Sequence, residues 1–334
     1  MKIESKAPTR VDLAGGTLDI WPLYLFHAGA VTVNAAITRY ARCVIETNEG
    51  ERIRLVSLDT KREESFPSLG ALTKAKKYKL PLLAQLVKIF APTRGFTLTT
   101  DSEAPAGAGI GGSSAMAVAI CAGLDRLTSA GKSKVEWIHT SRDAEALVIQ
   151  VPTGTQDHYP PAFGGAAAIE LLPGCERRAE LRIDLEELER RIMLVYTGKP
   201  RQHGINNWEV YKAHIDGKGE VAGNLEKISR IAQEMRGALE AANWREAGKL
   251  MHNEWGFRRK NLPTISTKMI DRIIEGARKK GALAGKVCGA GGGGCLVMLI
   301  EPDARERVAR VVEEEGGEVL EMKIDRNGVQ VGLG

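Results

Sequence analysis

The spacing of apolar residues along the chain predicts both strands and helices. Apolar and polar positions alternate over 40–47 and 52–58, on either side of Asn48-Glu49-Gly50, and this arrangement predicts a β-hairpin. Further short runs of β-forming residues lie at 95–100, 191–197, 284–288, 295–300 and 318–324. Apolar residues at helical spacing recur at 80–90, 113–127, 134–149, 221–242, 244–258, 266–280 and 304–315.

The order of these patterns predicts an α+β fold. The stretch 151–165, which Pro and Gly interrupt, is expected to be an ordered loop, and the pattern becomes mainly helical after about residue 200. A chain of 334 residues exceeds the usual size of one hydrophobic core. We therefore expect two domains that share a cleft, over 1–178 and 179–334, with the boundary near 172–184.

The charge balance bears on the class of partner. The 47 Lys and Arg residues and the 42 Asp and Glu residues give a formal net charge of +5, and the excess is spread along the chain. A nucleic-acid-binding protein more often carries a dense basic stripe, and the short run Lys74, Lys76, Lys77 and Lys79 is typical of a solvated surface. We expect an anionic small molecule as partner, and no nucleic acid.

The cysteines and the first residues bear on the compartment. The five cysteines are widely separated, without a C-x-x-C pair or histidines at ligand spacing, so neither disulfides nor structural zinc is expected. Residues 1–8 carry charge where a signal peptide needs an apolar core, and no apolar run reaches transmembrane length. The expectation is a cytoplasmic protein without a membrane partner.

The glycine-rich segment 105–115 carries the strongest chemical signal. Glycines let the backbone approach a bulky anion, and the start of the following helix adds unpaired N–H donors and the positive end of the helix dipole. The segment is therefore predicted to bind phosphate groups. Gly107, Gly109 and Gly112 also match the dinucleotide pattern G-x-G-x-x-G, but such a loop should follow the first strand of the fold. A P-loop would need Lys where Ser113 stands.

A second glycine run, 289–294, matches the same dinucleotide pattern, so the pattern alone discriminates little. By itself this run predicts either a tight turn between two strands or part of a binding site.

Three segments in this order resemble the GHMP kinase superfamily, which includes galactokinases, homoserine kinases, mevalonate kinases and phosphomevalonate kinases. They are 7–19, the loop at 107–115 and the run at 289–294, and together they span nearly the whole chain. The resemblance implies a ribosomal protein S5 domain 2-like N-terminal domain and a ferredoxin-like C-terminal domain. It also implies an enzyme that uses ATP and Mg²⁺ to phosphorylate a hydroxyl group of a small molecule.

Within the superfamily, the segments 154–159, 162–165 and 281–288 are similar to fucokinases and to the heptose kinases that phosphorylate the anomeric hydroxyl of D-glycero-D-manno-heptose 7-phosphate. The first motif departs from theirs, because they usually carry a third glycine and a Thr-Asp pair where this chain has Gly15-Gly16-Thr17-Leu18-Asp19. The spacing from Arg10 to Asp19 is kept, although the neighbours that face the substrate differ. The resemblance implies a sugar kinase.

The resemblance also assigns roles to single residues. Asp157 would accept the proton of the attacking hydroxyl, and Arg10 would stabilise that carboxylate and the charge in transfer. Ser114 and Glu145 would supply oxygen ligands of Mg²⁺. The residues expected to wrap the triphosphate of ATP are Pro105, Gly107, Gly109, Gly111, Gly112, Ser113 and Ser114. The residues expected on the acceptor side are Asp19, Gly16, Thr17, Gly291 and Gly292.

Two basic groups could bind a phosphate that the substrate already carries. One is Lys199, Arg201 and His203, after a predicted strand. The other is 258–260, at the end of a predicted helix, where basic residues complement the helix dipole without any ligand. The sequence assigns no adenine pocket.

Three functions are weighed. The leading one is a sugar kinase that phosphorylates O1 of a heptose phosphate or a related sugar. A mevalonate or phosphomevalonate kinase would use the same chemistry, but the segment 154–165 argues against it. A non-catalytic sensor of sugar and ATP would not need both a base and a metal ligand. Assembly into a homodimer is left open.

Overall fold

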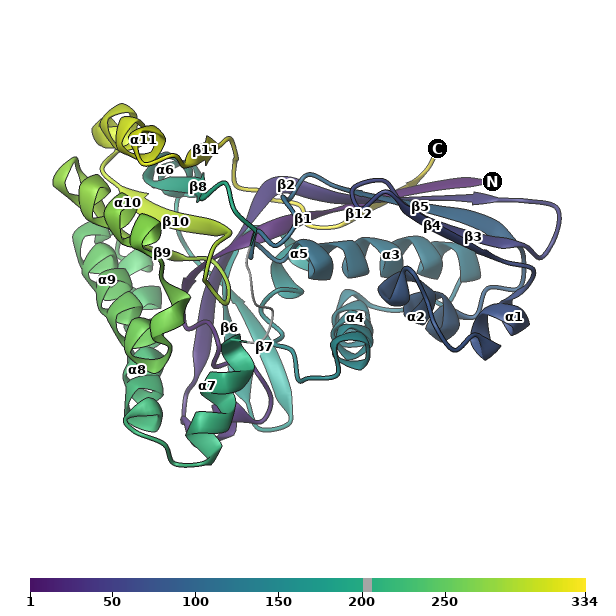
Figure 1. Cartoon of the computed structure of the whole chain (residues 1–334), viewed down its shortest axis with the longest axis horizontal. Helices are drawn as coiled ribbons and strands as arrows, with labels where there is room; N and C mark the ends of the chain where they lie inside the picture. The colour runs from purple at the N-terminus through teal and green to yellow at the C-terminus, as the bar shows by residue number, and fades with distance from the viewer. Residues whose placement is uncertain (201–205) are drawn as a thin grey trace.

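The chain forms two β-sheets, each covered by helices, in a computed structural model that describes residues 1–200 and 206–334. Figure 1 shows the larger sheet with helices α2, α3 and α4 beneath it, and the helices α8 to α11 gathered around a smaller sheet at the opposite end. This arrangement confirms the predicted α+β class.

Strands from both ends of the chain build the larger sheet. They are β1 (Lys2–Ala14), β2 (Val31–Thr47), β3 (Ile53–Ser57), β4 (Arg62–Phe66), β5 (Phe96–Ser102), β6 (Ala166–Leu172), β7 (Cys175–Glu180) and β12 (Gln330–Leu333). Their order is β12-β1-β2-β5-β3-β4, while β6 pairs with the first part of β2 and with β7. The long antiparallel pairing of β1 with β2 sets Arg10 opposite Ala36 and Asp12 opposite Asn34.

The prediction of a hairpin over 40–58 is wrong, because β2 and β3 do not pair with each other. Strand β5 lies between β2 and β3, antiparallel to β2 and parallel to β3, and β3 pairs with β4 instead. The backbone N–H of Asn48 donates to the carbonyl oxygen of Gly95 at 3.0 Å, so the predicted turn contacts the residue before β5. Alternation identified both strands, but closeness in sequence does not decide which strands pair.

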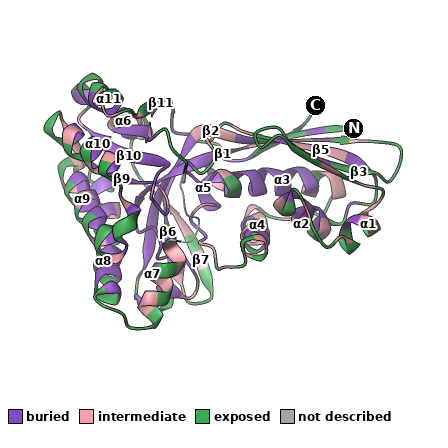
Figure 2. Cartoon of the chain, viewed as in Figure 1, coloured by how far each residue is buried: buried purple, intermediate pink, exposed green. Residues whose placement is uncertain are grey.

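Helices cover one face of the larger sheet. They are α1 (Leu69–Lys74), α2 (Pro81–Phe90), α3 (Gly112–Thr128), α4 (Lys134–Ile149) and α5 (Tyr159–Phe163). Helix α3 is buried along most of its length (Figure 2), and its small residues allow this: a Cβ on Gly123 would lie 3.1 Å from Ile45. Helix α4 begins with a capping box between Ser133 and Glu136. Helix α5 lies within the stretch predicted as an ordered loop.

The smaller sheet is antiparallel, in the order β11-β8-β10-β9. Its strands are β8 (Ile192–Tyr196), β9 (Ala282–Val287), β10 (Cys295–Ile300) and β11 (Glu318–Leu320). The accompanying helices are α6 (Leu185–Arg191), α7 (Asn206–Ile215), α8 (Val221–Glu240), α9 (Trp244–Asn261), α10 (Lys268–Lys279) and α11 (Arg305–Glu314). Short 3-10 turns are η1 (Leu23–Phe26), η2 (Pro263–Ile265) and η3 (Pro302–Ala304). The strand predicted over 318–324 ends at Leu320.

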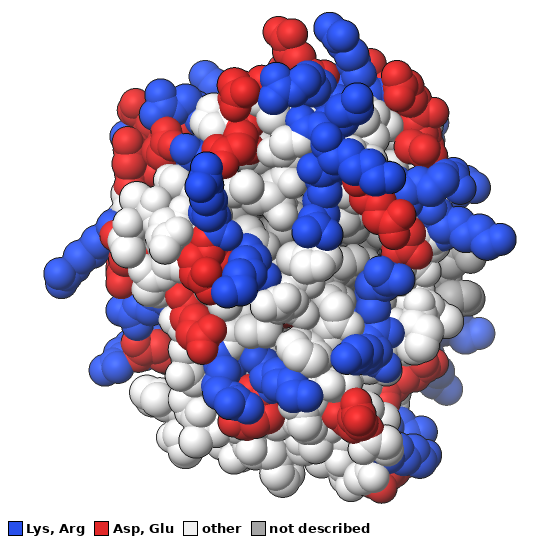
Figure 3. Space-filling view, turned by 90° about the vertical axis from the view of Figure 1, so that its left-hand side faces the viewer, with Lys and Arg blue, Asp and Glu red and all other residues white. Residues whose placement is uncertain are grey.

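The end of the chain returns to the larger sheet, because β12 pairs antiparallel with the start of β1. The division into 1–178 and 179–334 stays a prediction. The face drawn in Figure 3 intersperses Lys and Arg with Asp and Glu. Within the described ranges, no helix combines the length and the apolar character needed to cross a membrane.

Candidate active site

The predicted site residues converge on one cavity of about 910 Å³. Its lining includes Arg10, Thr17, Asp19, Pro105, Gly107, Gly109, Gly111, Gly112, Ser113, Ser114, Glu145 and Asp157. Among the residues predicted for catalysis, ATP, magnesium or the acceptor, all of which are described, Gly16, Gly291 and Gly292 do not line it. Gly16 lies behind the wall, where an added Cβ would come within 2.3 Å of Asp12 Oδ2. Gly291 and Gly292 pack against Ile265, whose carbonyl oxygen accepts from Gly292 N at 2.9 Å.

The glycine-rich segment 105–115, predicted to bind phosphate groups and called the phosphate loop below, has the backbone conformation that its glycines favour. Gly107, Gly109 and Gly111 all have positive φ angles of 70–75°, which strain other residues, and α3 begins at Gly112. The start of α3 therefore opens onto the cavity with unpaired N–H groups and a positive helix end. The end of the second glycine run supports this loop from behind: a Cβ on Gly294 would lie 2.6 Å from the carbonyl oxygen of Ala108, which accepts from the next residue, Cys295 N, at 2.7 Å.

Arg10 is a fully buried side chain that holds Asp157 against the phosphate loop. Its Nε and Nη2 lie 2.8 and 2.6 Å from Asp157 Oδ1, and its Nη1 donates to the carbonyl oxygen of Gly109 at 2.8 Å. Burial alone would lower the pKa of Arg10, but the carboxylates of Asp157 and Asp12 outweigh it and raise that pKa. The guanidinium is thus a permanent positive charge beside Asp157, whose side chain is 32% exposed.

Glu145 and the two serines form a compact set of oxygen atoms at the start of α3. Ser113 Oγ donates to Glu145 Oε1 at 2.5 Å, and Ser114 Oγ donates to Glu145 Oε2 at 2.8 Å. Burial works to raise the pKa of Glu145, but His158 and both serines outweigh burial and lower it. Glu145 is therefore ionised at neutral pH.

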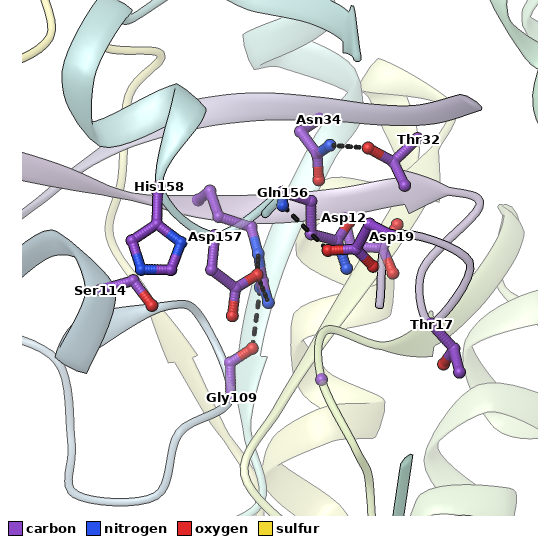
Figure 4. Close-up of polar contacts among 12 residues, drawn as sticks. Asp12, Thr17, Asp19, Thr32, Asn34, Gly109, Ser114, Gln156, Asp157 and His158 are labelled. Atoms are coloured by element: carbon purple, nitrogen blue, oxygen red, sulfur yellow. Dashed lines mark hydrogen bonds and ion pairs between the residues drawn. The ribbon is translucent and has the colours of Figure 1, made fainter. Parts of the chain in front are cut away.

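His158 lies in the segment 154–159 but was not predicted as a site residue, and it is completely buried beside this set. Its Nε2 lies 2.8 Å from Glu145 Oε2, and its Nδ1 has no hydrogen-bond partner among the described residues. Figure 4 shows Asp157 between His158 and Ser114 on one side and Asp12 and Asp19 on the other. No spacing rule could have found this contact, which depends on packing of α4 against the segment before α5.

Asp19 is a buried carboxylate at the other end of the cavity. Its Oδ2 accepts a hydrogen bond from Gln156 N at 2.9 Å, and a Cβ on Gly154 would lie only 2.0 Å from the same oxygen. Burial, and then the charge of Asp157, raises the pKa of Asp19 to about 7. Nearby, Thr17 Oγ1 donates to Asn207 Oδ1 at 3.2 Å, so α7 also reaches this end.

The cavity has an apolar part that the sequence did not predict. It is lined by residues 80–83 at the start of α2 and by Met116, with the hydroxyl-bearing side chains Ser57, Thr100 and Ser102 nearby. Such a lining could hold the adenine ring of ATP, since purine sites are mostly apolar with a few polar groups. These residues come from four separate segments, which is why no local pattern revealed them.

The structure places the two basic groups that were proposed to bind a substrate phosphate differently. Arg201 and His203 lie outside the described residues. Arg258 is buried and engaged, because its Nη2 donates to the carbonyl oxygen of Gly289 at 2.8 Å and its Nη1 lies 3.4 Å from Asp12 Oδ2. Arg259 and Lys260 are exposed, and neither lines the cavity.

Known proteins share this architecture over the full length of the chain. A D-glycero-alpha-D-manno-heptose 7-phosphate kinase of Campylobacter jejuni is 27% identical, over 98% of both chains. A mevalonate kinase of Thermococcus sibiricus is 24% identical, over 99% of this chain and 98% of its own. The crystal structure of a D-glycero-D-manno-heptose 1-phosphate kinase from Bacteriodes thetaiotaomicron superposes with a TM-score of 0.80 at 25% identity, over 99% of this chain and 98% of its own.

Two family models match the chain in the expected order. The model of the GHMP kinases N-terminal domain matches residues 75–165, which include the phosphate loop, Glu145 and Asp157. The model of the GHMP kinases C-terminal domain matches residues 235–318, which include the second glycine run. The chain therefore belongs to the GHMP kinase superfamily and is an ATP-dependent phosphotransferase with an alcohol group as acceptor.

Proposed function

We propose that this kinase phosphorylates a sugar hydroxyl, with the anomeric O1 of a heptose phosphate or a related sugar as the acceptor. The observation that carries the proposal is the position of the buried Asp19 carboxylate in the same cavity as the Arg10–Asp157 pair and the phosphate loop. A carboxylate has two acceptor oxygens, which suit neighbouring hydroxyls of a sugar. The similarity to proteins named heptose phosphate kinases supports the same choice.

In the proposed reaction, the hydroxyl oxygen of the acceptor attacks the γ-phosphorus of ATP, and Asp157 accepts the proton of that hydroxyl. The bond between the γ-phosphorus and the β–γ bridging oxygen breaks, and ADP leaves. Arg10 fixes the orientation of Asp157 through Nε and Nη2. Its charge also favours the negative charge that moves through the transferring group. Asp157 then releases the proton to solvent, which its partial exposure permits.

The oxygen atoms at the start of α3 fit a magnesium ion. Glu145 is ionised and bonded to Ser113 and Ser114, and hard oxygen ligands of this kind suit Mg²⁺, which keeps further positions for phosphate oxygens and water. Within residues 1–200 and 206–334, no group of three or more His, Cys, Asp or Glu side chains could hold a metal by itself. Ser114 and Glu145 would hold Mg²⁺ together with the phosphate groups of the nucleotide, and the ion would neutralise phosphate charge.

The remaining residues would bind and orient the two substrates. The phosphate loop and the N–H groups at the start of α3 would hold the triphosphate, and the apolar lining at residues 80–83 would take adenine. Asp19 would bind the acceptor hydroxyls, with Thr17 nearby. A cytoplasmic location and a homodimer stay predictions from the sequence.

The test is ATP consumption with magnesium across a panel of heptose 7-phosphate, free heptoses, fucose, galactose, mannose and mevalonate, with phosphorus NMR on any product. Turnover of one sugar, with phosphate on its anomeric carbon, would support the proposal and name the substrate. Turnover of mevalonate alone would reassign the acceptor, a result that the similarity to a mevalonate kinase makes worth including. Binding of ATP and sugar without turnover would favour a sensor.

A further inference from the structure

Four charged side chains form a buried network beside the cavity. They are Asp12 on β1, Glu254 and Arg258 on α9, and Lys286 on β9, and each is at most 5% exposed. Lys286 Nζ lies 3.1 Å from Asp12 Oδ2 and 2.7 Å from Glu254 Oε1, while Arg258 Nη1 lies 3.4 Å from Asp12 Oδ2. The network joins the larger sheet to the helix and strand of the smaller one.

Stability alone does not account for these residue types. Each buried ion loses its hydration, and an apolar cluster of similar volume often stabilises a fold as well or better. Two acids and two bases balance in charge, yet Asp12 Oδ1 and Glu254 Oε2 have no hydrogen-bond partner within the described ranges. The network therefore keeps a buried carboxylate at Asp12, two residues from Arg10, although burying it without a full set of hydrogen bonds is unfavourable.

The position of Asp12 lets it compete with Asp157 for the guanidinium of Arg10. Arg10 and Asp12 both line the cavity, and Figure 4 shows Asp12 beside Asp19 on the side of Asp157 away from Ser114. The charge of Asp12 already contributes to the raised pKa of Arg10. Without the Lys286 ammonium, 3.1 Å away, the Asp12 carboxylate would draw the Arg10 guanidinium away from Asp157.

The same network reaches the phosphate loop through backbone carbonyls. Arg258 Nη2 donates to the carbonyl oxygen of Gly289, and a Cβ on Gly289 would lie 2.9 Å from the carbonyl oxygen of Gly109. That oxygen of Gly109 is the one that accepts from Arg10 Nη1. Arg258, which pairs with Asp12, is thus linked to the Arg10 guanidinium through the backbone of Gly289 and Gly109.

We propose that Lys286 and Arg258 are positioning residues for phosphoryl transfer: by holding and neutralising Asp12, they leave Arg10 to bind Asp157. The inference rests on the proposed roles of Arg10 and Asp157. It does not depend on which alcohol is the acceptor.

Two charge-balanced double variants separate this role from a merely structural one. K286M alone leaves two acidic residues, Asp12 and Glu254, with one basic residue, Arg258, in the buried network. D12N/K286M removes the competing carboxyl group together with Lys286, whereas E254Q/K286M makes the same change in charge but keeps Asp12. Both doubles should regain thermal stability relative to K286M. We expect kcat to fall by about 10–100-fold in K286M and E254Q/K286M, and to return to within about fivefold of wild type in D12N/K286M.

Recovery of kcat in both doubles, in step with their melting temperatures, would assign the network a structural role and overturn the proposal. Failure of D12N/K286M to recover more than E254Q/K286M would overturn it as well. The comparison between the doubles holds even if K286M does not fold.

A second measurement needs no acceptor substrate, so its result does not depend on which alcohol the kinase phosphorylates. In protein labelled with nitrogen-15 arginine, the Nε–H resonance of Arg10, identified by its loss in R10K, reports the hydrogen bond to Asp157. It should shift in E254Q/K286M and return in D12N/K286M, and an unmoved resonance in both would contradict the proposal. Wild-type inactivity on the whole panel would count against the sugar acceptor only.

Discussion

Arg10 Nε donates a hydrogen bond of 2.8 Å to Asp157 Oδ1, although 147 positions separate the two residues. The bond joins β1 to the segment that precedes α5. A second bond from the same guanidinium to Gly109 ties both residues to the phosphate loop. The candidate base is therefore held in one orientation before any substrate binds, which is the condition for efficient in-line transfer.

Asp157→Asn should abolish most of the turnover while leaving ATP binding intact, because an amide cannot accept the acceptor's proton. We expect kcat to fall by about 10²–10⁴-fold. Steady-state turnover and calorimetric ATP titration measure the two effects. Asp143→Asn is the matched control, since Asp143 is an exposed carboxylate on α4, 66% exposed. Near-normal turnover of Asp157→Asn would remove Asp157 from the role of base.

Glu145→Gln should raise the magnesium requirement, because the substituted amide keeps the shape of the side chain but loses its charge. We expect the magnesium concentration at half-maximal turnover to rise by about 10-fold or more. Glu136→Gln on the same helix is the control, since Gln also fits the capping box at that position. An unchanged magnesium titration in Glu145→Gln would count against the ligand role.

Asp19 predicts a pH dependence on the acceptor side. Its pKa of about 7 means that the carboxylate forms only as the pH rises through neutrality. If the ionised form binds the acceptor, kcat/KM for the acceptor should rise between about pH 6 and pH 8. Asp19→Asn should lack this rise as well as lose acceptor affinity. An identical acid limb in wild type and variant would exclude Asp19 as its source.

The same raised pKa predicts an effect of opposite sign on stability. A carboxyl group whose pKa is higher in the folded state than in the unfolded state destabilises the fold progressively as the pH rises from 3.8 to about 7. Relative to wild type, Asp19→Asn should gain stability over that range, by on the order of 4 kcal/mol at most, and should show no such gain below pH 3.8. Denaturant unfolding at several pH values measures the difference.

Gly294→Ala should disturb the phosphate loop from behind. A Cβ there would lie 2.6 Å from the carbonyl oxygen of Ala108, at a φ of 79° that Ala rarely adopts. We expect a loss of about 1–3 kcal/mol of stability and a higher KM for ATP. Gly237→Ala on α8 is the control, because nothing lies within 4 Å of an added Cβ and the helix should gain stability. An unaltered KM for ATP in Gly294→Ala would contradict the supporting role of the second glycine run.

Local patterns predicted the elements better than their partners. The helices α2, α3, α4, α8, α9, α10 and α11 lie within a few residues of their predicted bounds, because helical spacing and caps act over a single turn. The strands β1, β6 and β7 were not predicted. Strand β1 carries Arg10, while β6 pairs with the first part of β2 and β7 pairs with β6. The residues of β1 and β6 do not alternate cleanly, since much of both strands is buried on both faces.

The amino-acid sequence by itself predicted the glycine-rich loop at the start of α3, because glycine conformations and helix starts depend on neighbouring residues. The roles proposed for Arg10, Glu145 and Asp157 came from the resemblance that the three ordered segments carry. The tertiary structure alone decided that β5 separates β2 from β3, that His158 contacts Glu145, and that Lys286 pairs with Asp12. Each of these relationships joins segments that are distant in the chain, and burial, rather than local backbone preference, brings them together.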